Sequence, residues 1–333
     1  MSFQEKVNGG AFISGLGGYL PENVLTNNDL EEMVDTSDEW IRTRTGIIER
    51  RIASSHFATS DIATEASILA INDAGITPQQ IDMIICATIT PDNLFPSTAC
   101  LIQRNLGNHK AAAFDVSAAC SGFIYALSLA DLFVRSKTYE NVLVIGAETL
   151  SKFIDWKDRS TCVLFGDGAG AVVISPSTTE SRILSIHLFA DGRFSDLLGI
   201  PGGGSRFPCT QDTVKKRLHF IRMKGNETFK IAVKSMVEAS NTALEENKIS
   251  ADHVDLFVSH QANNRIIQAA AQRLGVPDDR VVISLDRFGN TSAASIPITL
   301  WDAAQNGKLK RGKMVLLAAF GGGLTWGSSL IRW

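Results

Sequence analysis

The sequence contains no long apolar run, since no stretch approaches the roughly 18 residues that a membrane-spanning helix needs. Its first residues, Met1 to Lys6, lack the pattern of a secretory signal peptide. Of its 333 residues, 44% are hydrophobic and 20% are charged, as in ordinary globular proteins. We therefore expect a soluble, cytoplasmic protein with a sizeable core and a length that allows two domains.

Cysteine is scarce, and charge of either sign is balanced. The five cysteines share no C-x-x-C or zinc-type spacing: Cys86, Cys100, Cys120, Cys162 and Cys209. Their odd number and spacing indicate neither a disulfide framework nor a structural metal, so we expect reduced thiols. A net charge of -3 gives no general attraction to nucleic acid or anionic membrane, and no basic, aromatic-rich stretch supports nucleic-acid binding. An acidic partner therefore requires a local basic patch.

An internal repeat is the main architectural signal. Residues 66–82 align without a gap on residues 239–255, at a constant spacing of 173. Both copies lead into a short apolar run that predicts a strand, over 83–87 and 256–259, and then into a predicted helix. Apolar spacing also predicts a helix over 227–246. The recurrence of helix, strand and helix indicates mixed sheets covered by helices.

Glycines mark two further features. Phe165-Gly-Asp-Gly-Ala-Gly170 looks like a dinucleotide fingerprint, but an apolar strand follows where that motif needs a helix, so we interpret these residues as hairpin glycines. Phe320-Gly-Gly-Gly-Leu-Thr-Trp326 is the counterpart in the second half. The stretch 198–210 is the only strongly Gly/Pro-rich segment and predicts a linker or active-site loop. We predict two halves, residues 1–180 and 181–333.

Cys120 lies where an apolar strand-like run ends and a long apolar helix-like run begins. The unpaired N–H groups and positive dipole end of a first helical turn favour a thiolate, which predicts a lowered pKa for this thiol. Ser121 and Gly122 are small enough to let a substrate approach. One interpretation is a nucleophile that handles thioesters. The other is the buried structural role that free cysteines usually have.

His260 and Asn290 follow similar junctions in the second half. His260 ends the apolar strand of the repeat, and Asn290 lies in Phe288-Gly-Asn-Thr-Ser-Ala-Ala, where we interpret it as the counterpart of Cys120. Taken alone, a strand-end histidine is more often structural, and a Gly-Asn pair is usually a turn or N-cap. Three such groups at strand-to-helix junctions of a duplicated fold form a more specific set.

Together these motifs resemble β-ketoacyl-acyl-carrier-protein synthase III over almost the whole chain. The resemblance rests on Ala-Ala-Cys120-Ser-Gly-Phe, His260-Gln-Ala-Asn, Gly-Asn290-Thr-Ser-Ala-Ala, Asp38-Glu-Trp40-Ile-Arg-Thr-Arg44-Thr-Gly-Ile, Asp158-Arg159 and the two glycine motifs. It implies the thiolase fold, in which two duplicated α/β halves form α-β-α-β-α layers, and a homodimer. It also implies a reaction that starts fatty-acid synthesis by condensing acetyl-CoA, or another short acyl-CoA, with malonyl-acyl carrier protein.

The resemblance assigns the chemistry to a few residues. Cys120 would take the acyl group from coenzyme A, and the backbone N–H groups of Cys120 and Gly322 would form the oxyanion hole. His260 and Asn290 would then stabilise the enolate that forms as malonyl-acyl carrier protein loses carbon dioxide. The acyl-enzyme is the shared intermediate of both steps.

The resemblance also implies three binding sets. Coenzyme A would be held by Thr36, Trp40, Arg44, Arg159 and Asn263, with Trp40 and Arg159 on either side of the adenine. The acyl pocket would use Phe95, Phe165 and Phe320, with Phe95 reaching into the partner subunit. Acidic acyl carrier protein would contact Lys230, Arg265 and Arg273. No metal is implied, and no cofactor beyond the coenzyme A thioester that serves as substrate.

Other functions on the same fold match the residues less well. Thiolases and elongating condensing enzymes pair their cysteine with another His or Cys, whereas Asn290 stands here. Hydroxymethylglutaryl-coenzyme A synthase and decarboxylation-free relatives usually depend on a catalytic carboxylate, and no acidic residue adjoins Cys120, His260 or Asn290 in a motif that suggests one. A non-catalytic carrier-binding subunit, the alternative from another class, typically lacks the nucleophile.

Overall fold

The computed structural model describes residues 10–333, so the expectation about Met1 to Lys6 lies outside the described residues. The strands are β1 Gly10–Tyr19, β2 Asn23–Thr26, β3 Glu49–Ile52, β4 Met83–Ala87, β5 Ala112–Val116, β6 Val142–Thr149, β7 Asp167–Ser177, β8 Arg182–Ala190, β9 Leu198–Gly199, β10 Arg222–Met223, β11 Leu256–Ser259, β12 Met314–Gly321 and β13 Thr325–Arg332. The helices are α1 Asn27–Glu31, α2 Asp38–Thr45, α3 Thr59–Asp73, α4 Thr98–Asn105, α5 Gly122–Arg135, α6 Arg159–Cys162, α7 Gln211–Lys215, α8 Gly225–Glu246, α9 Asn264–Leu274, α10 Leu285–Phe288 and α11 Ser295–Gln305.

Two sheets organise the molecule, and four strands of the first have the same topology as the four strands of the second. The first has the order β1-β7-β6-β4-β5 and the second β8-β13-β12-β11. In each, a parallel pair, β4 with β6 or β11 with β12, continues into an antiparallel pair, β6 with β7 or β12 with β13. The internal repeat therefore predicted the duplicated α/β fold correctly, and the strands and helix that it predicted are β4, β11 and α8.

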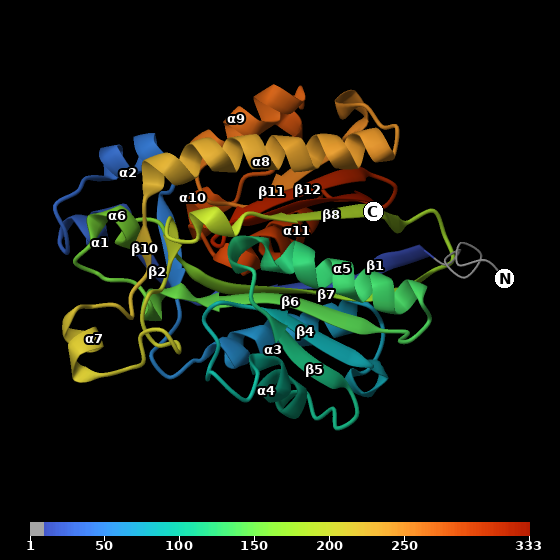
Figure 1. Ribbon diagram of the computed structural model, residues 1–333. Helices are drawn as coiled ribbons and strands as arrows, with labels where there is room; N and C mark the ends of the chain where they lie inside the picture. Colours follow the sequence, from blue (N-terminus) through green and yellow to red (C-terminus); the bar gives the residue numbers. More distant parts are fainter. Residues whose placement is uncertain (1–9) are drawn as a thin grey trace.

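Five layers stack on one another in Figure 1. Helices α8 and α9 cover the outer face of the second sheet, α5 and α11 lie between the sheets, and α3 and α4 cover the outer face of the first. The central strands are buried on both faces. Along β6, Val144 packs into the middle layer while Leu143 and Ile145 pack toward α3. Burial on both faces explains why these strands are continuous apolar runs.

The glycines of the Phe165–Gly170 motif lie elsewhere than predicted. Gly168 and Gly170 are inside β7 and not in a hairpin turn. A Cβ on Gly170 would approach the backbone of Pro297 and Ile298 to 2.7 Å, and one on Gly168 would come within 2.8 Å of the Ile298 side chain. These glycines allow α11 to pack closely on the first sheet. The strand that follows the glycines agrees with the rejection of a dinucleotide fingerprint.

The Gly/Pro-rich stretch begins with β9, after the first strand of the second sheet. Because β8 starts at Arg182, we propose the boundary between residues 180 and 181 for the two halves. The stretch 198–210 then lies inside the second half, and its first residue, Leu198, lines both of the cavities that meet at Cys120.

Within residues 10–333, every helix is too short or too polar to cross a membrane.

Candidate active site

Cys120 lies in a tight 3-10 turn, Ala119–Ser121, between β5 and α5. Ala119 has a φ of 46°, which is unusual for a residue with a side chain. The Ser121 hydroxyl lies 2.7 Å from both the Ala118 carbonyl and the Thr325 hydroxyl, so β13 braces the turn. Only 6% of Cys120 is exposed. The predicted strand-to-helix junction is confirmed, with the cysteine held on a strained, well-supported turn.

The lowered pKa predicted for Cys120 is wrong. Burial raises the pKa of the thiol to about 12, the Ser292 hydroxyl and the local backbone N–H lower it, and the nearby Glu148 carboxyl raises it further. The sequence pattern revealed the helix start but not the depth of burial. Burial destabilises the thiolate more than the helix start stabilises it. The resting site therefore holds a neutral thiol.

His260 directly follows β11, and only 3% of it is exposed. Its backbone N–H donates to the Ala318 carbonyl at 2.8 Å, which continues the β11–β12 pairing. Its Nδ1 lies 2.7 Å from the Ser295 hydroxyl, at the first residue of α11. Burial lowers the pKa of His260 to about 3, so the ring is neutral near pH 7.

Asn290 is fixed by three hydrogen bonds. Its N–H donates to the Leu164 carbonyl at 2.9 Å, and its carbonyl accepts the Gly166 N–H at 3.0 Å. Its side-chain oxygen accepts the Ser292 N–H at 2.9 Å, which leaves the amide NH₂ as the end available to a ligand. Asn290 is therefore held as a hydrogen-bond donor on the wall of the site.

The interpretation of Asn290 as the counterpart of Cys120 is wrong. The second half has its own 3-10 turn, Ser292–Ala294, before α11, and Ser292 has a φ of 48°, close to that of Ala119. Since Ala119 and Ser292 are 173 residues apart, as are the repeats, Ala293 occupies the place of Cys120. Asn290 precedes this turn. The sequence pattern alone did not show whether Asn290 or Ala293 is the counterpart of Cys120.

A cavity of about 670 Å³ brings the three chemical groups together, because Cys120, His260 and Asn290 all line it. Other predicted residues on its wall are Trp40, Arg44, Phe165, Lys230, Asn263, Arg265 and Phe320. A second cavity, of about 350 Å³, shares Cys120, Phe165 and Leu198 with the first. Cys120 thus lies at the junction of a large cavity and a small one.

The triple glycine, residues 321–323, packs against the Ala119–Ser121 turn. A Cβ on Gly321 would lie 2.6 Å from the Cys120 nitrogen and 3.1 Å from the Ser121 nitrogen. Gly322 lines the small cavity together with Cys120, and a Cβ there would meet the Leu198 carbonyl at 2.9 Å. Only glycine lets the end of β12 approach Cys120 this closely.

Trp40 and Arg159 lie in direct contact. The Arg159 guanidinium carbon is 4.9 Å from the centroid of the Trp40 ring, and the Arg159 side chain donates to the Asp35 carbonyl at 2.8 Å. Arg159 lines a third hollow of about 350 Å³, with Asp35 and Lys157, and not the large cavity. Because the Trp40 ring and the Arg159 guanidinium are already in contact, an adenine ring could lie between them only after they move apart.

Asn263 has a structural task that the sequence did not reveal. It is the N-cap of α9, where its side-chain oxygen accepts the Arg265 N–H at 2.8 Å and its amide donates to the Arg44 carbonyl at 2.9 Å. It therefore ties α9 to the end of α2. The first turn of α9 carries Arg265, which is exposed, as is Lys230 on α8.

Besides Arg159, three predicted site residues are not on the walls of the two cavities at Cys120. Phe95 is 86% exposed, beside Leu94 at 85%. Arg273 is exposed at the far end of α9. The Thr36 hydroxyl is buried without a hydrogen-bond partner, before α2.

Sequence reasoning missed Glu148. This residue is fully buried at the end of β6, where its carboxylate accepts hydrogen bonds from the Thr90 hydroxyl at 2.6 Å and the Thr88 hydroxyl at 3.2 Å. Burial raises its pKa to about 7, and these hydrogen bonds oppose the rise. Glu148 adjoins none of Cys120, His260 and Asn290 in the sequence, but its carboxyl raises the pKa of Cys120 through space. A charged residue ending an otherwise apolar strand was the available signal.

No cluster of three or more His, Cys, Asp or Glu side chains is arranged to hold a metal ion in the described part of the chain.

The duplicated sheets, the buried cysteine on a strained turn and the converging histidine and asparagine define a thiolase-fold enzyme that transfers acyl groups. Residues 114–192 match the family described as 3-Oxoacyl-[acyl-carrier-protein (ACP)] synthase III, and residues 244–333 match its C-terminal family. The chain belongs to the 3-oxoacyl-[acyl-carrier-protein] synthase III family, as its resemblance in sequence predicted.

Relatives match over nearly the full length. The chain is 56% identical over 329 residues to "Beta-ketoacyl-[acyl-carrier-protein] synthase III" of Caldanaerobacter subterraneus subsp. tengcongensis, covering 99% of each chain. It is 51% identical over 327 residues to the protein of the same name from Clostridioides difficile, covering 98% of this chain and 99% of the relative. The crystal structure of 3-oxoacyl-[acyl-carrier-protein] synthase III from Aquifex aeolicus VF5 has a TM-score of 0.91 and 52% identity, covering 97% of this chain and 100% of that one.

Proposed function

We propose that this acyltransferase starts fatty-acid synthesis by joining a short acyl group, taken from coenzyme A, to malonyl-acyl carrier protein through an acyl-Cys120 intermediate. The observation that carries the proposal is the convergence of Cys120, His260 and Asn290 on one cavity, with a smaller cavity adjoining at the cysteine. The large cavity suits the arm of a carrier or coenzyme. The small one suits a short acyl group.

In the first step, the Cys120 sulfur attacks the thioester carbonyl and coenzyme A leaves as its thiol. The proton lost by Cys120 and the proton gained by coenzyme A balance, so the step is proton-neutral overall. The carbonyl oxygen becomes negative in the transition state, where the backbone N–H groups of Cys120 and Gly322 are assigned to bind it. The absence of side chains at Gly321 and Gly322 supports this assignment, because it lets the end of β12 lie close to the Cys120 turn.

In the second step, malonyl-acyl carrier protein loses carbon dioxide and the resulting enolate carbon attacks the acyl-enzyme. The enolate oxygen needs hydrogen-bond donors, and we assign this role to the Asn290 amide and the neutral His260 ring. The hydrogen bond that Asn290 Oδ1 accepts from the Ser292 N–H supports the assignment, because it leaves the Asn290 NH₂ free to donate. The new carbon–carbon bond forms as the Cys120 sulfur leaves, which restores the thiol once it regains a proton.

The same proposal covers binding. Coenzyme A would bind through Thr36, Trp40, Arg44, Arg159 and Asn263, which requires the contact between Trp40 and Arg159 to open. The acidic carrier protein would bind through Lys230, Arg265 and Arg273, and exposure of these cations favours contact with a partner. Phe165 and Phe320 would shape the acyl pocket.

The proposal further includes a homodimer in the cytoplasm, with Phe95 closing the pocket of the partner subunit. The exposure of both Leu94 and Phe95 supports a protein contact at this loop, because large apolar side chains rarely pair on a free surface. The proposed acyl transfer and condensation need only the two thioester substrates, without a metal or a further cofactor.

The test is intact-protein mass spectrometry after mixing the chain with acetyl-CoA and several longer acyl-CoA compounds, with Cys120→Ser as control. One acetyl group per chain, absent from the control, supports the first step. Faster loading by a longer acyl chain keeps the mechanism and changes the primer. No loading from any acyl-CoA contradicts the proposal and favours a non-catalytic carrier-binding subunit.

A further inference from the structure

The contact between His260 and Ser295 determines which ring nitrogen faces the cavity. The two side chains are buried, with 3% and 2% of their surface exposed, and His260 Nδ1 lies 2.7 Å from Ser295 Oγ. The other partner of Ser295 Oγ is the backbone N–H of Gln261, which donates to it at 3.4 Å. Ser295 thus has one incoming hydrogen bond from the backbone and one short contact with the ring.

Counting donors and acceptors decides the direction of that contact. The Gln261 N–H uses one lone pair of Ser295 Oγ, and the hydroxyl proton then needs an acceptor. Within the described residues, His260 Nδ1 is the acceptor in reach. If the ring proton were on Nδ1 instead, the buried Ser295 hydroxyl proton would have no partner, which costs free energy. The proton of the neutral ring therefore belongs on Nε2.

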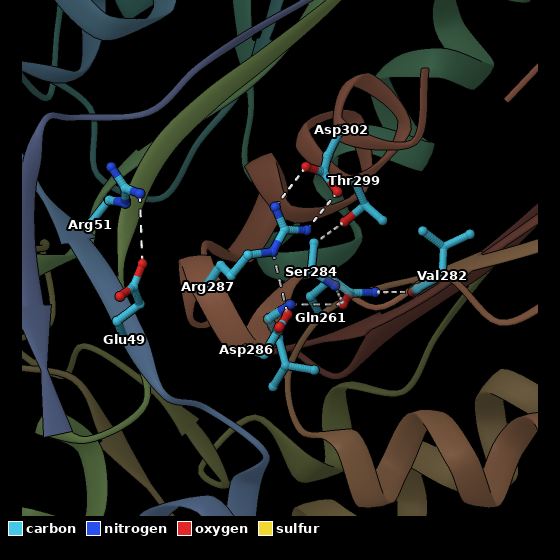
Figure 2. A network of polar contacts seen from close by, with 10 residues as sticks. Glu49, Arg51, Gln261, Val282, Ser284, Asp286, Arg287, Thr299 and Asp302 are labelled. Carbon is cyan, nitrogen blue, oxygen red and sulfur yellow. Dashed lines mark hydrogen bonds and ion pairs between the residues drawn. The ribbon is translucent and has the colours of Figure 1, made fainter. Parts of the chain in front are cut away.

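A network of polar contacts supports both residues, and Figure 2 shows from close by the part of it that joins Gln261, Ser284, Thr299 and the Arg287–Asp302 pair. The Gln261 side-chain oxygen accepts the Ser284 N–H at 2.9 Å, and its amide donates to the carbonyls of Ser259 at 2.9 Å and Val282 at 3.1 Å. Every polar atom of the Gln261 amide group is therefore engaged on the loop beside His260, which fixes the end of β11.

The same network fixes the start of α11. Ser284 Oγ lies 2.7 Å from Thr299 Oγ1, which in turn donates to the Ser295 carbonyl at 2.7 Å. Arg287 binds both carboxylate oxygens of Asp302, at 2.8 and 2.7 Å, and joins α10 to α11 (Figure 2). Both partners of the His260–Ser295 contact thus stand on rigid, cross-linked elements, so the contact is preorganised.

We infer that Ser295 is a positioning residue that holds neutral His260 as the Nε2–H tautomer, so that the ring presents a hydrogen-bond donor to the cavity. The inference rests on the proposed function, in which His260 donates to the enolate oxygen. It adds the cause: with the proton on Nδ1, the ring would present a lone pair to that oxygen and repel it. The low pKa of His260 keeps the ring neutral, which makes the choice of tautomer matter.

The direct test is ¹⁵N NMR of the full chain labelled at histidine, with the His260 signals assigned by their loss in His260→Asn. In the wild-type protein we expect a protonated Nε2 and an unprotonated Nδ1, unchanged between about pH 5.5 and 8.5 because the ring stays neutral. A proton on Nδ1, or a doubly protonated ring, overturns the inference. This measurement needs no other variant to fold.

Variants then test the consequence for the reaction. Ser295→Ala should mix the two tautomers and slow condensation about tenfold, the loss expected for one hydrogen bond, while acyl transfer to Cys120 changes less than about threefold. Ser295→Thr keeps the hydroxyl and should retain the Nε2–H signal. Ser240→Ala is the matched control, since it removes a buried serine hydroxyl that has no hydrogen-bond partner among residues 10–333.

The outcomes separate this inference from the proposed function. Unchanged tautomer and unchanged condensation in Ser295→Ala overturn the inference and leave the function intact. An equal loss of both partial reactions in Ser295→Ala indicates a merely structural role and also overturns it. A wild-type chain with the Nε2–H signal but without acyl transfer contradicts the proposed function alone.

Discussion

Replacing Gly321 with alanine tests how closely the end of β12 must approach Cys120. The backbone of Gly321 has an ordinary negative φ, so alanine brings no conformational strain of its own. The added Cβ would lie 2.6 Å from the Cys120 nitrogen, 3.1 Å from the Ser121 nitrogen and 3.2 Å from Cys120 Cα. Carbon atoms in normal contact are about 3.5–4.0 Å apart, so the two segments must separate by roughly 1 Å.

The Ala119–Ser121 turn cannot move freely to allow this separation. Hydrogen bonds of 2.7 Å join the Ser121 hydroxyl to Ala118 and Thr325, and the turn packs on β12 and β13. Overpacking of this kind costs about 1–3 kcal/mol of stability. Catalysis should suffer more, because moving an oxyanion donor by about 1 Å typically costs about 10²-fold in rate. We expect acylation of Cys120 to slow about 10²-fold in a protein that still folds.

The assay is rapid-quench mass spectrometry of acetyl-Cys120 formation, with a thermal melt to establish folding. Gly192→Ala is the matched control, because a Cβ there meets no atom within 4 Å and the residue also has a negative φ. A folded Gly321→Ala protein that acylates within about threefold of the wild-type rate would refute the close-approach argument.

Four further predictions follow. Asn290→Ala should keep acyl transfer but lose about 10²-fold in condensation, with the two partial reactions assayed separately. Trp40→Ala should raise KM for acetyl-CoA by about 5- to 30-fold, in steady-state kinetics, if the indole stacks on adenine. Arg265→Glu should weaken use of malonyl-acyl carrier protein and spare acetyl-CoA, in parallel titrations. Because burial raises the pKa of Glu148 from 4.5 to about 7, the folded protein keeps a proton there that the unfolded chain has lost. Relative to Glu148→Gln, wild-type stability measured by urea unfolding should therefore fall by up to about 3 kcal/mol as pH rises from 4.5 to 7.5.

Most of the fold could be predicted from the internal repeat and the motifs in the sequence. Strands buried on both faces must be continuously apolar, so 83–87 and 256–259 were recognisable as β4 and β11, and their common spacing of 173 revealed the duplication. Cys120 and His260 were recognisable because they follow the apolar strands β5 and β11. Asn290 instead follows the short helix α10, and only its Gly-Asn-Thr-Ser-Ala-Ala motif made it recognisable. Their convergence on one cavity depended on how the halves pack, which no local pattern records.

The electrostatics of the site required the three-dimensional structure. The sequence showed that Cys120 starts a helix, which favours a thiolate, but the dominant cause of its pKa is burial between two sheets. The same burial makes His260 neutral and raises the pKa of Glu148. Burial depends on elements far apart in the chain. The hydroxyl of Ser295, 35 residues from His260, was invisible for the same reason.

The pseudo-symmetry of the two turns explains how a duplicated fold produces an asymmetric site. Both turns have a strained residue at the same place, but Cys120 in the first corresponds to Ala293 in the second. A Cβ on Gly146 would lie 2.3 Å from the Ala293 carbonyl, and one on Gly122 would lie 3.6 Å from the Ala293 Cβ. The second turn therefore packs directly on the first half, and Ala293 is fully buried at the symmetric position. The candidate site is therefore asymmetric: the first turn contributes Cys120, the second has Ala293 in its place, and Asn290 lines the same cavity as Cys120.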